Sequence, residues 1–126
     1  MTREIKFRAW DKLEYRFVYS NKPSDFGFWK WVAYDDTTPL MQYTGLKDKN
    51  GVEIYEGDIV RAELNFKVMD DEVVEPKIFE VIYQFASFSL AADGIVEEFG
   101  YVYMSEYPPD KMEVIGNVHE NPELLK

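Results

Sequence analysis

Residues 40–60 read LMQYTGLKDKNGVEIYEGDIV, a stretch in which short apolar segments alternate with glycine-containing turns. Leu40–Thr44 is predicted to form a strand that ends at Gly45, and Val52–Tyr55 is predicted to pair back onto that strand. Asn50-Gly51 is typical of a tight turn, because glycine has no Cβ to clash and asparagine tolerates positive φ. The stretch therefore predicts a rigid loop between two paired strands.

The residues that precede this stretch predict more β-structure. Apolar and basic residues alternate over Glu4–Trp10, and the alternation resumes over Tyr15–Tyr19 after a polar turn. A period of two residues is that of a strand, so we expect a β-hairpin here. Phe28–Tyr34 is rich in aromatic residues and is predicted to form another strand, with Trp29 and Trp31 on the same face.

The residues that follow the stretch predict a second group of strands. Glu56-Gly57-Asp58 is expected to make a sharp corner, and Val60–Val68 then has the longest alternating pattern in the chain. Met69-Asp70-Asp71-Glu72 is predicted to close this strand as an acidic turn. Five further elements are predicted in chain order: β-strand material over Ile78–Phe88, a hairpin turn at Ala92-Asp93-Gly94, a strand over Ile95–Met104, a helical turn at Ser105-Glu106-Tyr107 and a last strand over Met112–Val118.

The order long strand, hairpin, strand, helical turn and strand is that of a small SH3-like β-barrel. We therefore predict an all-β protein in which an N-terminal β-hairpin/meander unit joins a small SH3-like β-barrel, with short helical turns only. The expected units are 1–56, basic and aromatic, and 57–126, the barrel with its C-terminal tail. A chain of 126 residues is short for two independent domains, so the units should form one compact body.

Composition excludes several classes of protein. The chain has no cysteine, which rules out disulfides, a thiolate nucleophile and the usual structural zinc sites. No run of about 18 apolar residues occurs, and the N-terminus MTREIKFRAW has no apolar signal core. We therefore expect no membrane association and a cytoplasmic location.

Charge is unevenly distributed along the chain, whose formal net charge is −10. Residues 1–34 carry seven Lys/Arg against four Asp/Glu, whereas residues 63–126 carry four against fourteen. The acidic second half would repel duplex nucleic acid, since phosphate neutralisation normally supplies most non-specific affinity. The basic first segment could instead lie against acidic surface, within one chain or between subunits.

No constellation of catalytic or ligand residues stands out. His119 is the only histidine, and no serine sits in a glycine-flanked nucleophile elbow. The acidic clusters Asp70-Asp71-Glu72 and Glu97-Glu98 lack the alternating oxygen-ligand spacing of a calcium loop. We therefore predict no catalytic residue, no metal site and no cofactor, and hence a protein that is not an enzyme.

Aromatic and basic residues near the N-terminus form the best candidate for a working surface. Aromatic rings beside guanidinium or ammonium groups can stack on nucleobases or anchor a protein partner. The six residues of this candidate interaction surface are Arg3, Lys6, Arg8, Trp10, Trp29 and Trp31.

Four segments of the chain carry a resemblance to a known family. They are IKFRAWD at Ile5–Asp11, LMQYTGLKDKNG at Leu40–Gly51, IYEGDIV at Ile54–Val60 and VIGNVHENPELL at Val114–Leu125. Together they closely resemble the YopX family of phage and prophage proteins. The resemblance implies an all-β, homo-oligomeric protein carried by a temperate phage or its integrated remnant in a bacterium, and it implies no reaction.

The family motif has structural rather than catalytic character. Its glycines could cradle a ligand, but turn geometry alone accounts for them. His119 stands where the family more often has tyrosine, which argues against a shared catalytic histidine. The motif residues are Gln42, Tyr43, Thr44, Gly45, Leu46, Asp48, Asn50, Gly51, Ile54, Tyr55, Gly57 and Asp58.

Three hypotheses about function follow from these observations. The first is a non-catalytic, self-associating protein-interaction module that touches a host or phage protein, with its basic aromatic N-terminal unit against acidic barrel surface. The second is a nucleic-acid-binding accessory protein that uses the N-terminal basic and aromatic face. The negative net charge of the chain argues against this hypothesis. The third is an acidic nucleic-acid mimic that acts on a host protein, a hypothesis that rests on the sign of the charge alone.

Overall fold

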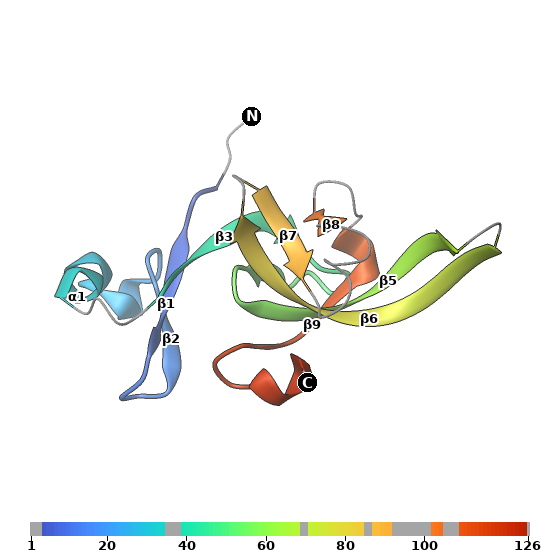
Figure 1. Ribbon diagram of the computed structural model, residues 1–126. Helices are drawn as coiled ribbons and strands as arrows, with labels where there is room; N and C mark the ends of the chain where they lie inside the picture. Colours follow the sequence, from blue (N-terminus) through green and yellow to red (C-terminus); the bar gives the residue numbers. More distant parts are fainter. Residues whose placement is uncertain are drawn as a thin grey trace.

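The computed structural model describes residues 4–34, 39–68, 71–84, 87–91, 102–104 and 109–125. The fold is all-β, as predicted, with two antiparallel sheets (Figure 1). The first sheet has the order β2-β1-β3-β4, made of β1 (Phe7–Asp11), β2 (Arg16–Tyr19), β3 (Leu40–Lys47) and β4 (Glu53–Tyr55). The second has the order β8-β7-β6-β5-β9, made of β5 (Asp58–Val68), β6 (Asp71–Gln84), β7 (Ser87–Ala91), β8 (Val102–Tyr103) and β9 (Met112–Asn117).

The second sheet curves into a half-barrel, with β8 and β9 at its two edges. An SH3-like closure of this half-barrel stays a prediction. The last strand lies where it was predicted, and the short 3₁₀ helix η3 (Pro109–Lys111) comes directly before it. The C-terminal tail contains another 3₁₀ helix, η4 (Pro122–Leu125), which follows the capping-type Asn121.

The predicted N-terminal hairpin is confirmed. β1 pairs with β2 from Arg8↔Tyr19 to Asp11↔Arg16, and its turn is fixed by Asp11, whose Oδ1 accepts the backbone N–H groups of Leu13 and Glu14. The other edge of β1 pairs with β3. β1 is therefore the central strand of this unit, and both of its edges are used.

The prediction of a strand over Phe28–Tyr34 was wrong, because these residues form the helix α1. Gly27, at φ +85°, turns the chain into the helix, and Trp31 N–H donates to the Gly27 carbonyl at 3.0 Å. A further strand would need a free edge beside β2, but Asp25 occupies that edge: its Oδ2 accepts Tyr19 N–H at 2.8 Å. Asp25 belongs to the 3₁₀ helix η1 (Pro23–Asp25) that leads into α1.

The loop between β3 and β4 is tight, but it is not the predicted turn with two left-handed residues. Gly51 has φ +79°, whereas Tyr15 is the one non-glycine residue in the described ranges with positive φ, so Asn50 does not share the left-handed conformation. The turn is closed by Gly51 N–H, which donates to the Asp48 carbonyl at 3.0 Å. β4 pairs back onto β3 as expected, with a bulge between Tyr43 and Lys47.

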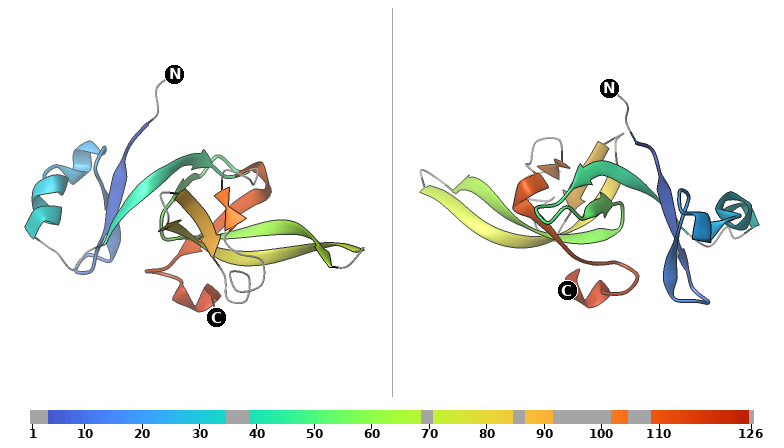
Figure 2. Two further views of the ribbon diagram at one scale, coloured as in Figure 1. Left: turned by 45° about the horizontal axis from the view of Figure 1, so that its top comes forward. Right: turned by 180° about the vertical axis from the view of Figure 1, so that it is seen from behind.

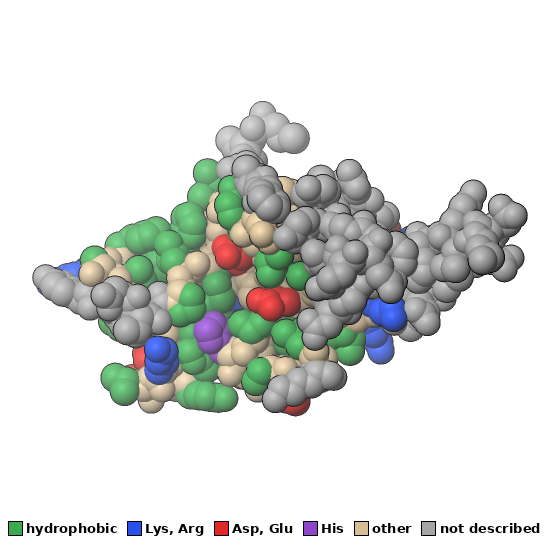
Figure 3. Space-filling view, viewed as in Figure 1, with side chains coloured by type: hydrophobic (Ala, Val, Ile, Leu, Met, Phe, Trp, Pro, Cys, Tyr) green, Lys and Arg blue, Asp and Glu red, His purple; other side chains and the backbone are tan. Residues whose placement is uncertain are grey.

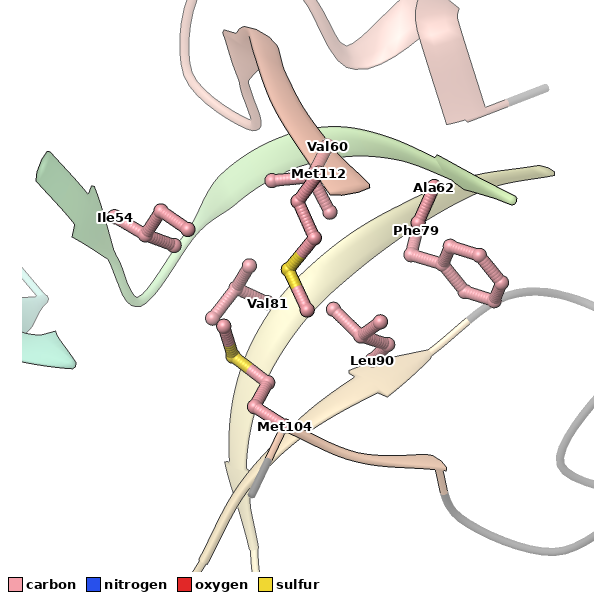
Figure 4. Packing of buried hydrophobic residues seen from close by; sticks show 8 residues of the cluster. All are labelled: Ile54, Val60, Ala62, Phe79, Val81, Leu90, Met104 and Met112. Carbon is pink, nitrogen blue, oxygen red and sulfur yellow. The ribbon is translucent and has the colours of Figure 1, made fainter. Parts of the chain in front are cut away.

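The main hydrophobic core lies against the curved second sheet. Its buried side chains point toward one another (Figure 4). Ile54 comes from β4 of the first sheet, so the core is shared between the two sheets. The other members of this cluster are Val60, Ala62, Phe79, Val81, Leu90, Met104 and Met112.

β5 and β6 continue well beyond the rest of their sheet. β9 pairs with β5 only from Asp58 to Ala62, and β7 pairs with β6 only from Glu80 to Gln84. The six remaining pairs, from Glu63↔Pro76 to Val68↔Asp71, form a two-stranded ribbon that extends away from the body (Figures 1 and 2). We call residues 63–76 the arm.

The arm corrects one prediction, and others fall outside the described residues. Asp71 and Glu72 were assigned to a turn but belong to β6, and Pro76 lies inside that strand. The β-strand material predicted over Ile78–Phe88 is divided between the end of β6 at Gln84 and the start of β7 at Ser87. Ala92–Gly94 and Ser105–Tyr107 lie outside the described residues, as does most of the strand predicted over 95–104.

Candidate interaction surface

A buried ion pair connects the two sheets. Arg8 comes from β1 in the first sheet, and Asp58 is the first residue of β5 in the second. Arg8 Nη2 donates to Asp58 Oδ1 at 2.8 Å and to the Glu56 carbonyl at 3.3 Å. Asp58 Oδ2 accepts the backbone N–H of Tyr55 at 2.7 Å, so the same carboxylate also fixes the corner between β4 and β5.

The guanidinium of Arg8 lies between two aromatic rings. Its Cζ is 3.9 Å from the ring centre of Phe17 and 4.6 Å from that of Tyr55. Arg8 is only 5% exposed, and its Nε has no hydrogen-bond partner among the described residues. Burial raises the pKa of Asp58 above its usual value, an effect that the nearby guanidinium and the Tyr55 N–H only partly offset.

Asp48, like Asp58, is a buried aspartate whose carboxylate accepts backbone N–H groups, in this case in the loop between β3 and β4. Its Oδ1 accepts the N–H groups of Asn50 and Val52 at 2.8 and 2.9 Å, and its Oδ2 accepts Val114 N–H from β9 at 2.8 Å. Burial alone would raise the pKa of Asp48, but these three hydrogen bonds outweigh it and the pKa is lowered. The loop is thereby bound to the edge strand of the second sheet, where Lys49 N–H also donates to the Met112 carbonyl.

Lys6 is likewise engaged inside the protein. Its Nζ forms ion pairs with Glu53 and, at 2.8 Å, with Glu4, and it lies 4.7 Å from the ring centre of Tyr43. Burial acts to lower the pKa of Lys6, but the hydrogen bonds to the two glutamates outweigh it, so the pKa is raised. Lys6 therefore stays charged and paired.

A cleft of about 390 Å³ lies where the hairpin, β4, β9 and the tail meet. Arg8 and Lys22 line it together with the acidic residues Glu53, Asp58 and Glu120, so it has no dominant charge. Its charged groups already serve internal pairs, because Arg8 bonds Asp58, and Glu53 bonds Lys6. The cleft is thus part of the contact between the sheets.

His119, in the C-terminal tail, packs against aromatic residues of the N-terminal hairpin. Its ring stacks on Trp10, with ring centres 5.2 Å apart and planes within 7°, and it meets Phe17 edge-on. Partial burial lowers the pKa of His119, and the nearby charges of Arg8 and Lys12 lower it further against a smaller opposing effect of Glu120. The histidine is a packing residue between the N-terminal hairpin and the C-terminal tail.

The six predicted surface residues do not form one exposed surface. Lys6, Arg8 and Trp10 are buried, and Arg3 lies outside the described residues. The two residues on α1 differ, because positions two apart point to different sides of a helix: Trp29 is 53% exposed, whereas Trp31 is half-buried.

The motif residues of the segment Leu40–Val60, which we call the joint, have structural positions. Several are buried, notably Tyr43, Ile54 and Tyr55, together with the two aspartates described above. Gly57 has φ +85°, and a Cβ there would lie 2.9 Å from Met41 Sδ. The joint is therefore occupied by packing and by hydrogen bonds within the chain.

An exposed aromatic patch lies on the N-terminal unit, in the segment that precedes the joint in the sequence. Phe26 is 99% exposed, and Trp29 packs its ring edge-on against Phe7 and Phe28, with centres 5.5 and 5.1 Å apart. A groove of about 390 Å³ runs between η1 and α1, and Lys22 and Lys30 help to line it. We call Lys22, Phe26, Trp29 and Lys30 the aromatic face.

Apolar exposure is concentrated in this unit. Hydrophobic side chains cover much of the left of the space-filling view, where the N-terminal unit lies (Figure 3). Sequence reasoning missed Phe26, although one signal was there: a lone aromatic residue in a stretch of loop composition has no alternating neighbours to share a core with. Seven of the nine large hydrophobic residues found exposed in the described ranges come from this unit: Ile5, Leu13, Tyr15, Phe26, Trp29, Leu40 and Val52.

The described residues offer little else that is chemically suggestive. They contain no group of three or more His, Asp or Glu that could hold a metal ion. None of the helices in the described part of the chain is both long and apolar enough to cross a membrane. Glu97-Glu98 and Asp70 lie outside the described residues.

Comparisons with known proteins place the chain among relatives. The sequence model of a family described as YopX protein matches residues 25–126. The crystal structure of protein EF1440 from Enterococcus faecalis is similar over 99% of this chain and 100% of its own, with 28% sequence identity and a TM-score of 0.57. No functionally curated protein matches the chain.

Proposed function

The chain belongs to the YopX family, and we propose that it is a non-catalytic protein-interaction module that associates with further copies of itself. The observation that supports this proposal is the aromatic face. Phe26 and Trp29 are large rings held on short helical elements, flanked by two lysines and a groove. Exposed aromatic residues in such a setting are typical anchors of protein–protein contacts.

The nucleic-acid alternative draws less support from the geometry. It relied on Arg8 and Trp10 to meet phosphates and bases, but Arg8 is bonded to Asp58 and Trp10 packs against His119. No observation favours the acidic mimic beyond the net charge. A phage or prophage origin and action in the bacterial cytoplasm are part of the proposal and rest on the family resemblance.

The proposal is tested by size-exclusion chromatography with light scattering over a range of protein concentrations in physiological salt. The expected mass is that of more than one chain, falling toward one chain on dilution. Phe26→Ser combined with Trp29→Ser should shift the equilibrium toward the monomer. Leu13→Ser is the matched control, because Leu13 is 97% exposed but lies at the hairpin turn. A monomer at every concentration would overturn the proposal.

A further inference from the structure

Two hollows beside the N-terminal hairpin lie end to end. The groove between η1 and α1 and the cleft beside β4 and β9 each have a volume of about 390 Å³, and both are lined by Asn21 and Lys22. The hairpin lies between α1 and the C-terminal tail in all views (Figures 1 and 2). The two hollows therefore form one depression that leads from α1 to the tail, which we call the long groove.

The α1 end of the long groove is basic. The acid that lines it, Asp25, is buried and paired with Arg16, so it presents no negative charge to a partner. Lys30 is exposed at this end. Lys22 stands in the middle of the long groove, where its Nζ lies 3.8 Å from the ring centre of Tyr19 in its own chain. Lys30 is therefore the lysine that is placed to meet an acid of a partner.

The tail end of the long groove is acidic. Two of the three acids that line the cleft are used inside the chain, in the ion pairs with Lys6 and Arg8. The third is Glu120, which is exposed and whose Oε1 accepts a hydrogen bond from Asn117 Nδ2 at 3.1 Å. An amide carries no charge, so this hydrogen bond leaves the negative charge of Glu120 available to a cation.

A surface with opposite charges at its two ends is complementary to itself, because a two-fold rotation reverses its direction. Resting on the proposed self-association, we propose that two copies pack long groove against long groove, about a two-fold axis that crosses the groove near Asn21. Lys30 of each copy then meets Glu120 of the other. Phe26, which is 99% exposed, enters the cleft of the second copy, whose walls include the aromatic rings of Phe17, Tyr19 and Tyr55.

Charge sets the orientation of this contact. Complementary charge favours the orientation that brings unlike ends together, and like charges disfavour the parallel orientation, in which Lys30 would face Lys30. A two-fold contact contains each residue pair twice. A single charge reversal therefore places two pairs of like charges in the contact.

A charge exchange within one chain tests this contact. Lys30→Glu alone, or Glu120→Lys alone, should raise the dissociation constant of the dimer about tenfold, measured by light scattering over a range of concentrations. The chain that carries both changes has opposite charges again, and its dissociation constant should return to near that of the wild type. Lys111→Glu and Glu123→Lys are the matched controls, because they make the same charge changes at exposed sites outside the long groove and should leave association unaltered.

The outcomes separate this inference from the proposed function. If the wild type is monomeric at every concentration, both fail. If the wild type associates and each single reversal behaves like its control, the contact lies elsewhere and only the long-groove contact is overturned. It is also overturned if the doubly reversed chain associates no better than the single variants.

Cross-linking keeps the test decisive if a charge-reversed variant does not fold. The chain has no cysteine, so the introduced thiols are the only ones. A chain with Lys30→Cys and Glu120→Cys should give dimers and nothing larger with a short bis-maleimide, because a two-fold contact places both links between the same two chains. Lys111→Cys replaces Glu120→Cys in the control, which should give far less dimer. Equal yields from the two variants, or a ladder of trimers and longer products, would contradict the two-fold contact.

Discussion

The joint and the aromatic face both lie in the first half of the chain, yet they use similar residues in opposite ways. In the joint, charged groups are buried and bonded: Asp48 accepts three N–H groups, and Asp58 pairs with Arg8. On the aromatic face, rings and lysines are exposed to solvent. The family-motif residues are therefore concentrated where the fold is held together. The surface that is available to partners lies outside the joint.

The largest effect is expected from removing the carboxylate of the ion pair. Asp58→Ala leaves the guanidinium of Arg8 buried without its counter-charge and deprives Tyr55 N–H of its acceptor. Losing one partner of a buried pair typically costs about 3–5 kcal/mol. Urea unfolding followed by circular dichroism measures the change in the free energy of unfolding.

A double-variant cycle is the control for this prediction. Arg8→Met combined with Asp58→Ala should cost less than the two single changes added together, because no unpaired charge is left. An Asp58→Ala cost below about 1 kcal/mol would mean that the pair does not hold the sheets together.

The next effect concerns the loop. Asp48→Ala removes the acceptor of three backbone N–H groups, and we expect a loss of about 2–4 kcal/mol, given about 1–3 kcal/mol for each buried group left unsatisfied and partial rescue by water. Asp48→Asn keeps one acceptor oxygen and should cost less. The pKa of Asp48 is lowered in the fold, so its contribution is present above its ordinary pKa and is lost as pH falls through the lowered value. Equal stability of the wild type and Asp48→Ala at pH 7 would refute this role.

Two glycines of the joint allow the cost of a steric clash to be separated from the cost of a left-handed backbone. Gly57→Ala introduces a Cβ 2.9 Å from Met41 Sδ at φ +85°, whereas Gly51→Ala at φ +79° meets nothing within 4 Å. Both changes carry the cost of the left-handed conformation, about 1 kcal/mol, and only Gly57→Ala adds a clash. Thermal unfolding should therefore give a lower midpoint for Gly57→Ala; a reversed order would contradict the packing described for the corner.

The smallest expected effect is a pH dependence at the contact between hairpin and tail. Because the pKa of His119 is lowered in the fold, the unfolded chain binds the proton more readily, and stability falls as pH drops below about 6.5. His119→Gln should flatten this part of the profile. The check is the difference between the two unfolding curves at pH 7.5 and pH 5.5, and parallel profiles would exclude the effect.

The strands and turns of the fold could largely be predicted from the sequence, because their signals are local. Alternation predicted β1, β2 and β5, and glycine chemistry predicted the corner at Gly57, which has φ +85°. The helix α1 could not be predicted in this way. Its residues favour strands by local propensity, but Asp25 blocks the edge of β2 that a further strand would need.

The candidate surface was harder to predict, because exposure depends on distant parts of the chain. Lys6 and Arg8 look like a basic face in sequence, but their partners Glu53 and Asp58 lie 47 and 50 residues away. Asp48 was recognised only as a motif residue, and its bond to Val114 spans 66 residues. Of the residues of the aromatic face, only Trp29 was among the six predicted from the sequence, because exposure is decided by tertiary structure.

The most direct test of this account is amide hydrogen exchange on the wild-type chain at low and high protein concentration. Amides of the joint that are bonded within the chain, those of Asn50, Val52 and Tyr55, should be protected equally at both concentrations. Amides of residues 22–30 should gain protection at the higher concentration. Concentration-dependent protection in the joint, with none in residues 22–30, would contradict the account.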